Sequence, residues 1–170
     1  MPTEAEIRAN QSVARNLREI VGQGINFPLR YSQGGKINSI ETSSAGERIS
    51  DSIHLILSTA IGERPFNPEF GSRLPQLVFE PNDLTLKSVL RFYTAEAIAR
   101  WEKRVDIQNV SFLDDYKDDN NSIGIRIEYS IRGSHIQGSY VYPFSLSGMP
   151  TGGQYTGGEI HNMNNPATVR

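Results

Sequence analysis

The sequence contains no cysteine among its 170 residues, and that absence excludes several kinds of site at once. Disulfide bonds, thiolate catalysis and zinc sites built on cysteine are all ruled out. Long apolar runs are missing as well, since none approaches the roughly 20 residues that a membrane-spanning helix needs. The polar residues 1–11 are not typical of a secretory signal peptide. We therefore expect a protein that makes no membrane contact and is assembled in the cytosol.

An excess of charge of either sign is also lacking. The chain has 17 Lys and Arg against 19 Asp and Glu, which gives a formal net charge of −2. The basic residues are scattered, whereas a nucleic-acid-binding domain gathers them on one surface. Apolar residues make up 37% and charged residues 21%, which is typical of a globular chain with a lean core. These values predict one domain of ordinary size that does not bind nucleic acid.

Three segments have the apolar spacing of helices. Residues 3–20 begin with a capping-box pattern, but their apolar stripe is thin, so this helix is predicted to depend on a neighbour or partner. Residues 47–59 place isoleucines at helical intervals. Residues 83–103 form the strongest pattern, in which Glu96 and Arg100 are one turn apart and able to form an ion pair. The predicted apolar face of this segment consists of Leu86, Leu90, Tyr93, Ala97 and Trp101.

Three alternating segments after the last helix predict an antiparallel meander. The first covers residues 105–112, where the alternation changes phase after Ile107 and so indicates a β-bulge. The second, residues 123–131, alternates without a fault, and the third covers residues 136–144. A shorter strand candidate lies at residues 37–40. The predicted fold class is therefore α+β: a small antiparallel β-sheet packed against two core helices, plus an N-terminal helical extension.

The chain is predicted to have three parts. Residues 1–21 form the helical extension, residues 22–147 the core domain, and residues 148–170 a tail. The tail contains five glycines, three asparagines and two prolines with little periodicity. Because it cannot bury enough apolar surface to offset its chain entropy, we expect it to be flexible unless a partner orders it.

Most residues that could carry chemistry lack the pattern that the chemistry requires. The three histidines are far apart and share no spacing for a metal site or a catalytic dyad. The acidic run at residues 114–119 lacks the glycine that an EF-hand loop has at its sixth position. Gly22 and Gly24 follow a helix rather than a strand and lack the third glycine of a dinucleotide fingerprint. We therefore expect neither a metal nor a cofactor.

The segment GERPFNPEFGSRL, which begins at Gly62, is the most unusual stretch of the chain. Glu63 and Glu69 are candidates for the acid and base of a glycosidase, but nothing in the spacing fixes their separation, and two prolines make the segment stiff. Two neighbouring arginines, Arg64 and Arg73, more naturally neutralise these acids than leave one with a raised pKa. Two aromatic residues are predicted to anchor the segment in the core: Phe66 and Phe70.

Several stretches, taken in order, resemble one known family. They are GINFPLR, ERISDSIHLILSTAIGERPFNPEFGSRL, VFEPND, AIARWEKRVDI and YVYPF, and they cover about residues 22–146. Their order and their residues resemble those of the small baseplate wedge protein of contractile-tailed phages. The same family includes small wedge subunits of type VI secretion and of extracellular contractile injection systems. The GER…PEFGS segment between two helices is the most specific part of the resemblance.

The resemblance implies structural work rather than catalysis. The implied partners are two larger baseplate wedge proteins, whose helices form a core bundle, and the tail sheath subunit, with hub or tube proteins as further candidates. It also implies that the first sheath ring is initiated through shared β-sheet. The family has sometimes been called lysozyme-like, and the residues above give that label no support.

The family's motif implies a wedge contact at five positions of this chain. Whether the charges in that motif bond within the chain or to a partner is left open, since Arg64 has five donors and Glu63 accepts. The implied contact residues are Glu63, Arg64, Pro65, Phe70 and Gly71.

Contact with the sheath is expected at an exposed strand edge, because edge N–H and C=O groups can pair with an added strand. One candidate is the last strand, about residues 137–144, with Gln137, Ser139 and Val141 as contact residues. The other is the early strand at residues 36–41. The alternative is an edge that the chain's own segments cover.

The sequence thus predicts a non-enzymatic baseplate wedge subunit of a contractile phage tail, located in the virion and assembled in the host bacterial cytoplasm. The alternative within this class is a wedge subunit of a type VI or extracellular contractile injection system. The alternative of another class is a lysozyme-like glycoside hydrolase that uses Glu63 and Glu69.

Overall fold

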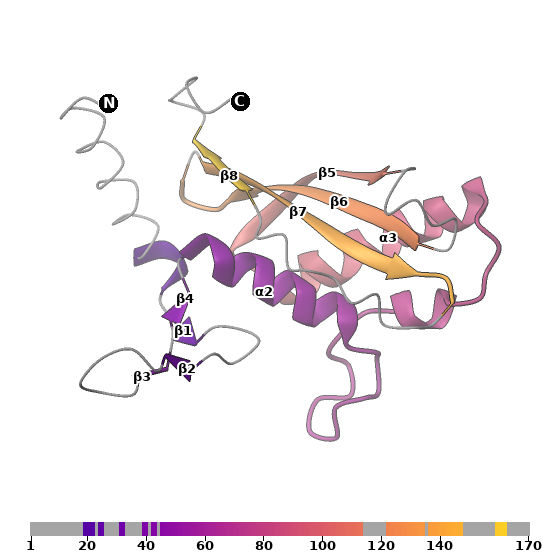
Figure 1. Ribbon diagram of the computed structural model, residues 1–170, viewed down its shortest axis with the longest axis horizontal. Coiled ribbons are helices and arrows are strands. Elements are labelled where there is room, and N and C mark those ends of the chain that lie inside the picture. The colour runs from indigo at the N-terminus through magenta and orange to yellow at the C-terminus, as the bar shows by residue number, and fades with distance from the viewer. Residues whose placement is uncertain are drawn as a thin grey trace.

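Two helices lie against one face of a four-stranded antiparallel sheet in the computed structural model (Figure 1). The residues described are 19–22, 24–25, 31–32, 39–40, 42–43, 45–113, 122–134, 136–147 and 159–162. The predicted α+β class is confirmed. No helix within these ranges is long and apolar enough to cross a membrane.

Helix α2 spans Ala45–Ser58 and agrees with the helix predicted at residues 47–59. Its isoleucines recur at helical spacing, so they fall on one side of the helix, and that side faces the core. Burying one such side chain contributes about 1.5–3 kcal/mol, so this face is the main reason that the segment is helical in the folded chain. The apolar residues of this face are Ile49, Ile53, Ile56 and Leu57.

Helix α3 spans Leu84–Trp101, within the predicted range. It begins after Asp83, whose side chain accepts a hydrogen bond of 2.7 Å from the backbone N–H of Leu86. This bond satisfies one of the free donors of the first turn. The predicted apolar face is confirmed, with Tyr93 and Trp101 only partly buried. The buried residues of α3 are Leu86, Leu90, Thr94, Ala97 and Ile98.

The sheet follows α3 as predicted. Its strands are β5 (Val105–Leu113), β6 (Ser122–Ile131), β7 (Ile136–Ser145) and β8 (Glu159–Asn162), in that spatial order. The predicted bulge is confirmed, because the register of β5 against β6 shifts between Ile107 and Asn109. A turn at Gly133, with φ of +78°, joins β6 to β7.

The two faces of the sheet differ in the way that the alternation predicts. On β6, the isoleucines and Tyr129 are buried, whereas Arg126 is exposed and Glu128 is half-buried. The helices cover the apolar face: α2 packs beside β7, and α3 packs under β5 (Figure 1). The other face carries polar side chains such as Arg126 and Glu128, as expected for a sheet with one side toward water.

Strand β8 was not predicted. The tail was expected to be flexible, yet its residues 159–162 pair antiparallel with the first part of β7. The pairing begins with Glu159 opposite Ser139 and ends with Asn162 opposite Ile136. Neither end of this contact could be inferred from alternation, because a four-residue strand is too short to show a pattern.

The chain before α2 forms two small strand pairs apart from the main sheet (Figure 1). Strand β1 (Gly24–Ile25) pairs with β4 (Thr42–Ser43), and β2 (Tyr31–Ser32) pairs with β3 (Ser39–Ile40). The strand predicted at residues 37–40 is therefore β3 in its last two residues. Of the helix predicted at residues 3–20, only the last two residues fall in the described range, and they are helical.

Candidate functional site

The loop between α2 and the short 3-10 helix η1 (Leu74–Leu77) is fixed at its base by the core. We call residues 59–73 the junction loop. The Ser72 N–H donates to the Thr59 carbonyl at 2.9 Å, and the Ser72 hydroxyl donates to the Leu57 carbonyl at 2.8 Å. Ser72 thereby satisfies a carbonyl at the end of α2 that has no partner within the helix. The base of the loop is therefore continuous with the helix rather than hinged to it.

Gly71 makes this close base possible. Its φ is +114°, and a Cβ at this position would lie 2.3 Å from the Thr59 carbonyl oxygen. Only glycine combines this backbone conformation with so close an approach. The implied contact residue Gly71 is itself buried, so it shapes the loop and offers no surface of its own.

The tip of the junction loop is cross-linked by its own backbone. The Gly62 N–H donates to the Pro68 carbonyl at 2.8 Å, and the Asn67 N–H donates to the Arg64 carbonyl at 3.2 Å. With prolines at positions 65 and 68, few torsions remain free. The loop extends away from the sheet below α2 (Figure 1). It is a preformed projection and not a flexible lid.

The two charges left open by the sequence have different surroundings. The Glu63 carboxylate accepts a hydrogen bond of 2.8 Å from the Ala60 N–H, so it bonds within the chain. The Arg64 guanidinium lies over the Phe70 ring, with its Cζ 4.1 Å from the ring centroid. Among the described residues this guanidinium has no hydrogen-bond or ion-pair partner. Glu63 thus shapes the loop, while Arg64 keeps its donors available.

An aromatic and cationic stack ties the loop to α3. The Phe70 ring lies 5.1 Å from the Trp101 ring between centroids, and the Arg100 Cζ lies 5.2 Å from the centroid of Trp101. Arg100 also forms an ion pair with Glu69. The predicted pairing of Arg100 with Glu96 is therefore replaced by a longer-range one. Phe70 is half-buried, which agrees with its predicted role as an anchor.

The prediction that Phe66 anchors the loop in the core is wrong. Its side chain has 102% relative exposure, so it packs on nothing and points into solvent at the tip of the loop. Pro65 beside it is exposed as well. Single exposed apolar residues are common on protein surfaces, and this one lies beside Arg64 on a loop that is held by its own hydrogen bonds. The signal was present in the sequence: Pro65 and Pro68 bracket Phe66 in a turn, and a tight turn cannot fold its middle residue back to the core.

The geometry does not suit the glycosidase alternative. The Glu63 carboxylate accepts a hydrogen bond from the Ala60 N–H and the Glu69 carboxylate pairs with Arg100, so both carboxylates are engaged within the chain. The hollow between the loop and α3 offers about 30 Å³, which holds one or two water molecules rather than a sugar. In the described part of the chain, no group of acidic or histidine side chains is arranged to hold a metal ion.

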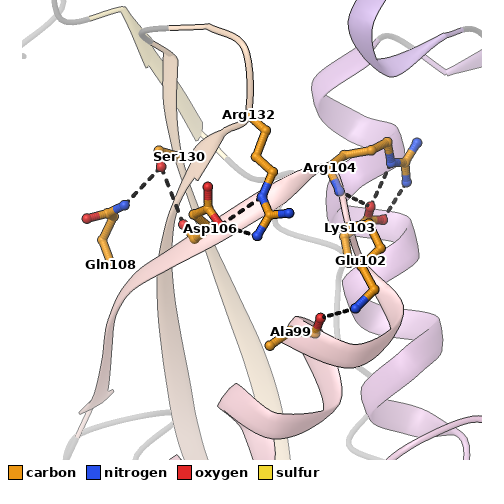
Figure 2. Close-up of polar contacts among 8 residues, drawn as sticks. All are labelled: Ala99, Glu102, Lys103, Arg104, Asp106, Gln108, Ser130 and Arg132. Atoms are coloured by element: carbon orange, nitrogen blue, oxygen red, sulfur yellow. Dashed lines mark hydrogen bonds and ion pairs between the residues drawn. The ribbon is translucent and has the colours of Figure 1, made fainter.

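A second polar cluster lies where α3 passes into β5 (Figure 2). Glu102 is 3% exposed and accepts two hydrogen bonds from the Arg104 side chain, one of them 2.7 Å from Nε. Arg104 also donates to the Val21 carbonyl at 3.2 Å. Burial would raise the pKa of Glu102, but hydrogen bonds from Arg104 and Ser52 and the Arg104 charge outweigh it and lower that pKa. A general acid needs a raised pKa, so we assign the Glu102–Arg104 pair a structural role.

His54 is likewise accounted for by packing. Its Nδ1 lies 2.8 Å from the Tyr140 hydroxyl, and its ring packs against Tyr142 with centroids 5.7 Å apart. Burial lowers the pKa of His54 and raises that of Tyr142 to about 12. The neutral ring joins α2 to β7, as expected for an ordinary polar residue and not for a catalytic base.

The predicted edge residues fall in two groups. Gln137 and Ser139 lie where β8 pairs with β7, opposite His161 and Glu159. Val141 lies beyond the end of β8, where no described residue pairs with this edge. Among the described residues, the alternative of an edge covered by the chain itself therefore applies to the first two residues. The other candidate edge, at residues 36–41, contributes β3 to a separate small sheet.

Comparison with known proteins gives one consistent family. Residues 43–135 match the sequence profile of the family described as baseplate wedge protein gp25. Baseplate protein W of Escherichia phage P2 is 32% identical over 65 residues, which cover 38% of this chain and 56% of that protein. The chain thus spans little more than half the length of this relative.

Two solved structures are similar in fold. A crystal structure of a candidate tail lysozyme from Geobacter sulfurreducens is 33% identical, with a TM-score of 0.58, over 64% of this chain and 96% of that one. A chain of the anti-feeding prophage baseplate, solved by cryo-EM, is 22% identical, with a TM-score of 0.60, over 71% of this chain and 93% of that one. At this lower identity the likeness concerns the fold alone.

Proposed function

Because this chain belongs to the baseplate wedge protein gp25 family, we propose that it is a structural subunit of the baseplate wedge in a contractile phage tail. In this function it joins two larger wedge proteins to the tail sheath and initiates the sheath through shared β-sheet. Its location is the baseplate of the virion, after assembly in the host cytoplasm. The similarity to a phage P2 protein favours a phage tail over the alternatives, a type VI or extracellular contractile injection system.

The observation that carries this proposal is the display of Phe66 beside Arg64 on the junction loop. Aromatic and arginine side chains provide most of the binding energy in protein interfaces. The loop is held by its own hydrogen bonds, so little conformational entropy is lost when a partner binds it. The contact set Glu63, Arg64, Pro65, Phe70 and Gly71 then divides by role. Arg64, Pro65 and the added Phe66 meet the partner, and the other three hold the loop.

The partner surface that suits this loop has an apolar pocket beside carboxylates or unpaired backbone carbonyls. Phe66 fills the pocket, and the Arg64 guanidinium, already placed over Phe70, donates to the oxygens. The last turn of a helix provides such carbonyls together with the negative end of its dipole. A bundle of helices from two larger wedge proteins therefore fits both requirements.

The contact with the sheath is proposed at the edge of β7. Within the described residues, no strand pairs with β7 from Val141 to Ser145 on the side away from β6. An extended segment of a sheath subunit is able to add to this edge by backbone hydrogen bonds. Catalysis is not part of the proposal, because the carboxylates of the junction loop are engaged in holding it.

Binding to the two larger wedge proteins from the same tail gene cluster tests the proposal. Phe66→Ala and Arg64→Ala are each expected to weaken that binding at least tenfold, since truncated hot-spot residues commonly cost about 2 kcal/mol. Phe92→Ala is the matched control: Phe92 lies on α3, outside the junction loop, and is 63% exposed, so its loss leaves binding unchanged. Thermal unfolding of all three variants stays within about 2 °C of wild type.

Wild-type binding by Phe66→Ala would overturn the wedge contact. The hydrolase alternative has its own test, which is release of soluble fragments from peptidoglycan by wild type and by Glu63→Gln. Cleavage by wild type that Glu63→Gln abolishes would replace the structural function by an enzymatic one. Absence of cleavage together with loss of wedge binding in Phe66→Ala supports the structural function.

A further inference from the structure

Among the described residues, the outer edge of β7 is paired over less than half of its length. Strand β7 has ten residues, and β8 pairs with only its first four, from Ile136 to Ser139. Both strands lie at the front edge of the sheet above α2 (Figure 1). The edge that β8 uses therefore continues past it, in line, for six more residues of β7. An edge that already accepts one strand in this register has the geometry to accept a longer one.

Pro143 shows which groups of β7 point to this edge. Opposite residues of an antiparallel pair alternate between exchanging two backbone hydrogen bonds and exchanging none. Pro143 has no N–H and lies opposite Gly124 of β6, so their pair is one without hydrogen bonds. The odd-numbered residues of β7 therefore direct their backbone groups outward. Gln137 and Ser139 direct theirs to β8, Val141 directs its own to the uncovered edge, and Pro143 offers only a carbonyl.

The backbone pairing that holds β8 is short. Its pairs with Gln137 and Ser139 provide about four backbone hydrogen bonds. Gly138 lies between them and has no side chain for β8 to pack on. A larger residue does not fit there, because a Cβ on Gly138 would lie 2.6 Å from the Tyr129 Cζ. The connection at residues 148–158 contains five glycines, which lose more conformational freedom on ordering than other residues. A longer strand with the same backbone bonds and more of them would displace β8.

We propose that β8 is an exchangeable strand, which covers the first part of the β7 edge in the free protein and leaves when an extended segment of the sheath subunit adds along all of β7. This inference depends on the proposed contact with the sheath. The incoming segment is antiparallel to β7, like β8, and about ten residues long. It has apolar side chains opposite Tyr140 and Tyr142, on the face that α2 supports, and needs no acceptor opposite Pro143.

The same features partly protect the edge of β7 against pairing with other strands. An open strand edge is a template for association, and proteins blunt such edges with short covering strands and prolines. Here β8 covers one part of the edge and Pro143 removes a donor from the other. Both protections are partial, so a segment that pairs along all of β7 overcomes them.

A disulfide between β7 and β8 tests the exchange in the full-length chain. Ser139 and Glu159 lie directly opposite each other in a hydrogen-bonded pair, where Cα atoms are about 5.5 Å apart, within the range of a disulfide. The chain has no other cysteine, so S139C/E159C forms one bond only. The measurement is binding to the sheath subunit encoded with this chain. Oxidised S139C/E159C is expected to bind at least tenfold more weakly than the reduced form, and S139C alone is expected to be insensitive to oxidation.

A second variant releases β8 instead of locking it. His161→Pro removes the N–H that faces Gln137 and is expected to strengthen sheath binding severalfold, with His161→Ala as control. Equal binding by the oxidised and reduced double variant would overturn the exchange while leaving the sheath contact intact. Failure of wild type, reduced S139C/E159C and His161→Pro to bind the sheath subunit at all would overturn the sheath contact, and the exchange with it.

Discussion

At Gly71 the backbone φ is +114°, and a Cβ would lie 2.3 Å from the carbonyl oxygen of Thr59. Gly62, nine positions earlier in the junction loop, also has a positive φ, of +90°, but nothing lies within 4 Å of its would-be Cβ. The two glycines thus separate two costs that usually occur together: an unfavourable backbone conformation and a steric clash. The sequence names both residues but does not distinguish them, because the clash depends on a contact across the loop base.

Replacing these glycines measures the difference. Gly71→Ala is expected to lower the free energy of unfolding by about 3 kcal/mol, since strain and clash add. Gly62→Ala is expected to lower it by about 1 kcal/mol, since it has strain alone. Urea denaturation followed by the fluorescence of the single tryptophan reports both values. Equal losses in the two variants would mean that the base of the loop moves to accommodate a side chain.

At the scale of helices and strands, hydrogen bonds between near neighbours in the sequence determine where an element begins. Helix α3 begins where Asp83 provides an oxygen to the Leu86 N–H, at 2.7 Å. Ser88, one turn into the helix, makes a bond of similar length, with its hydroxyl donating to the Leu84 carbonyl at 2.8 Å. The two bonds differ in consequence: the first satisfies a backbone donor with no other protein partner, and the second adds to a carbonyl already able to bond within the helix.

Removing each bond separates the cap from an ordinary side-chain contact. Asp83→Ala is expected to lower the free energy of unfolding by about 1 kcal/mol. Ser88 is exposed, and Ser88→Ala introduces a better helix former. The free energy of unfolding of this variant is therefore expected to change by no more than about 0.5 kcal/mol. Midpoints of urea unfolding, at unchanged m-value, give the comparison. A larger loss for Ser88→Ala than for Asp83→Ala would contradict the assignment of the cap.

Across the whole molecule, two polar contacts connect parts that are distant in sequence, and each contains a group with a shifted pKa. Glu102 and Arg104 hold the corner between α3 and β5 and bond to Val21, while His54 of α2 bonds to Tyr140 of β7. Both Glu102 and His54 have a lowered pKa in the folded chain. The unfolded chain therefore binds each proton at a higher pH than the folded chain does. Stability is complete above the ordinary pKa of each group and decreases as the pH falls below it.

Of these two groups, His54 loses its contribution first on acidification, below its ordinary pKa of 6.5. Between pH 7.5 and pH 5.5 the wild type is expected to lose about 1 kcal/mol more stability than His54→Gln, which keeps a polar group beside Tyr140 but does not titrate. The loss due to Glu102 begins only below its ordinary pKa of 4.5. Denaturant unfolding at pH 7.5, 5.5 and 4 resolves the two. Parallel pH profiles of wild type and His54→Gln would show that His54 titrates alike in both states.

The sequence by itself determined the parts that depend on neighbours along the chain. The period of 3.6 gave α2 and α3, the period of two gave β5 to β7, and a change of phase located the bulge after Ile107, because each pattern is repeated over a whole element. The motif at residues 62–74 was recognisable as the distinctive part of the chain for the same reason: its prolines, glycines and charges are contiguous.

The tertiary structure alone decided which side chains meet across the fold. Arg100 pairs with Glu69 rather than with Glu96, since an ion pair between exposed neighbours on one helix is worth only a few tenths of a kcal/mol and yields to any better-placed partner. Phe66 points into water because the folded loop projects from the core that could have covered it. β8 forms because the edge of β7 is there to receive it, and a strand's partner is a property of the whole sheet, not of its own four residues.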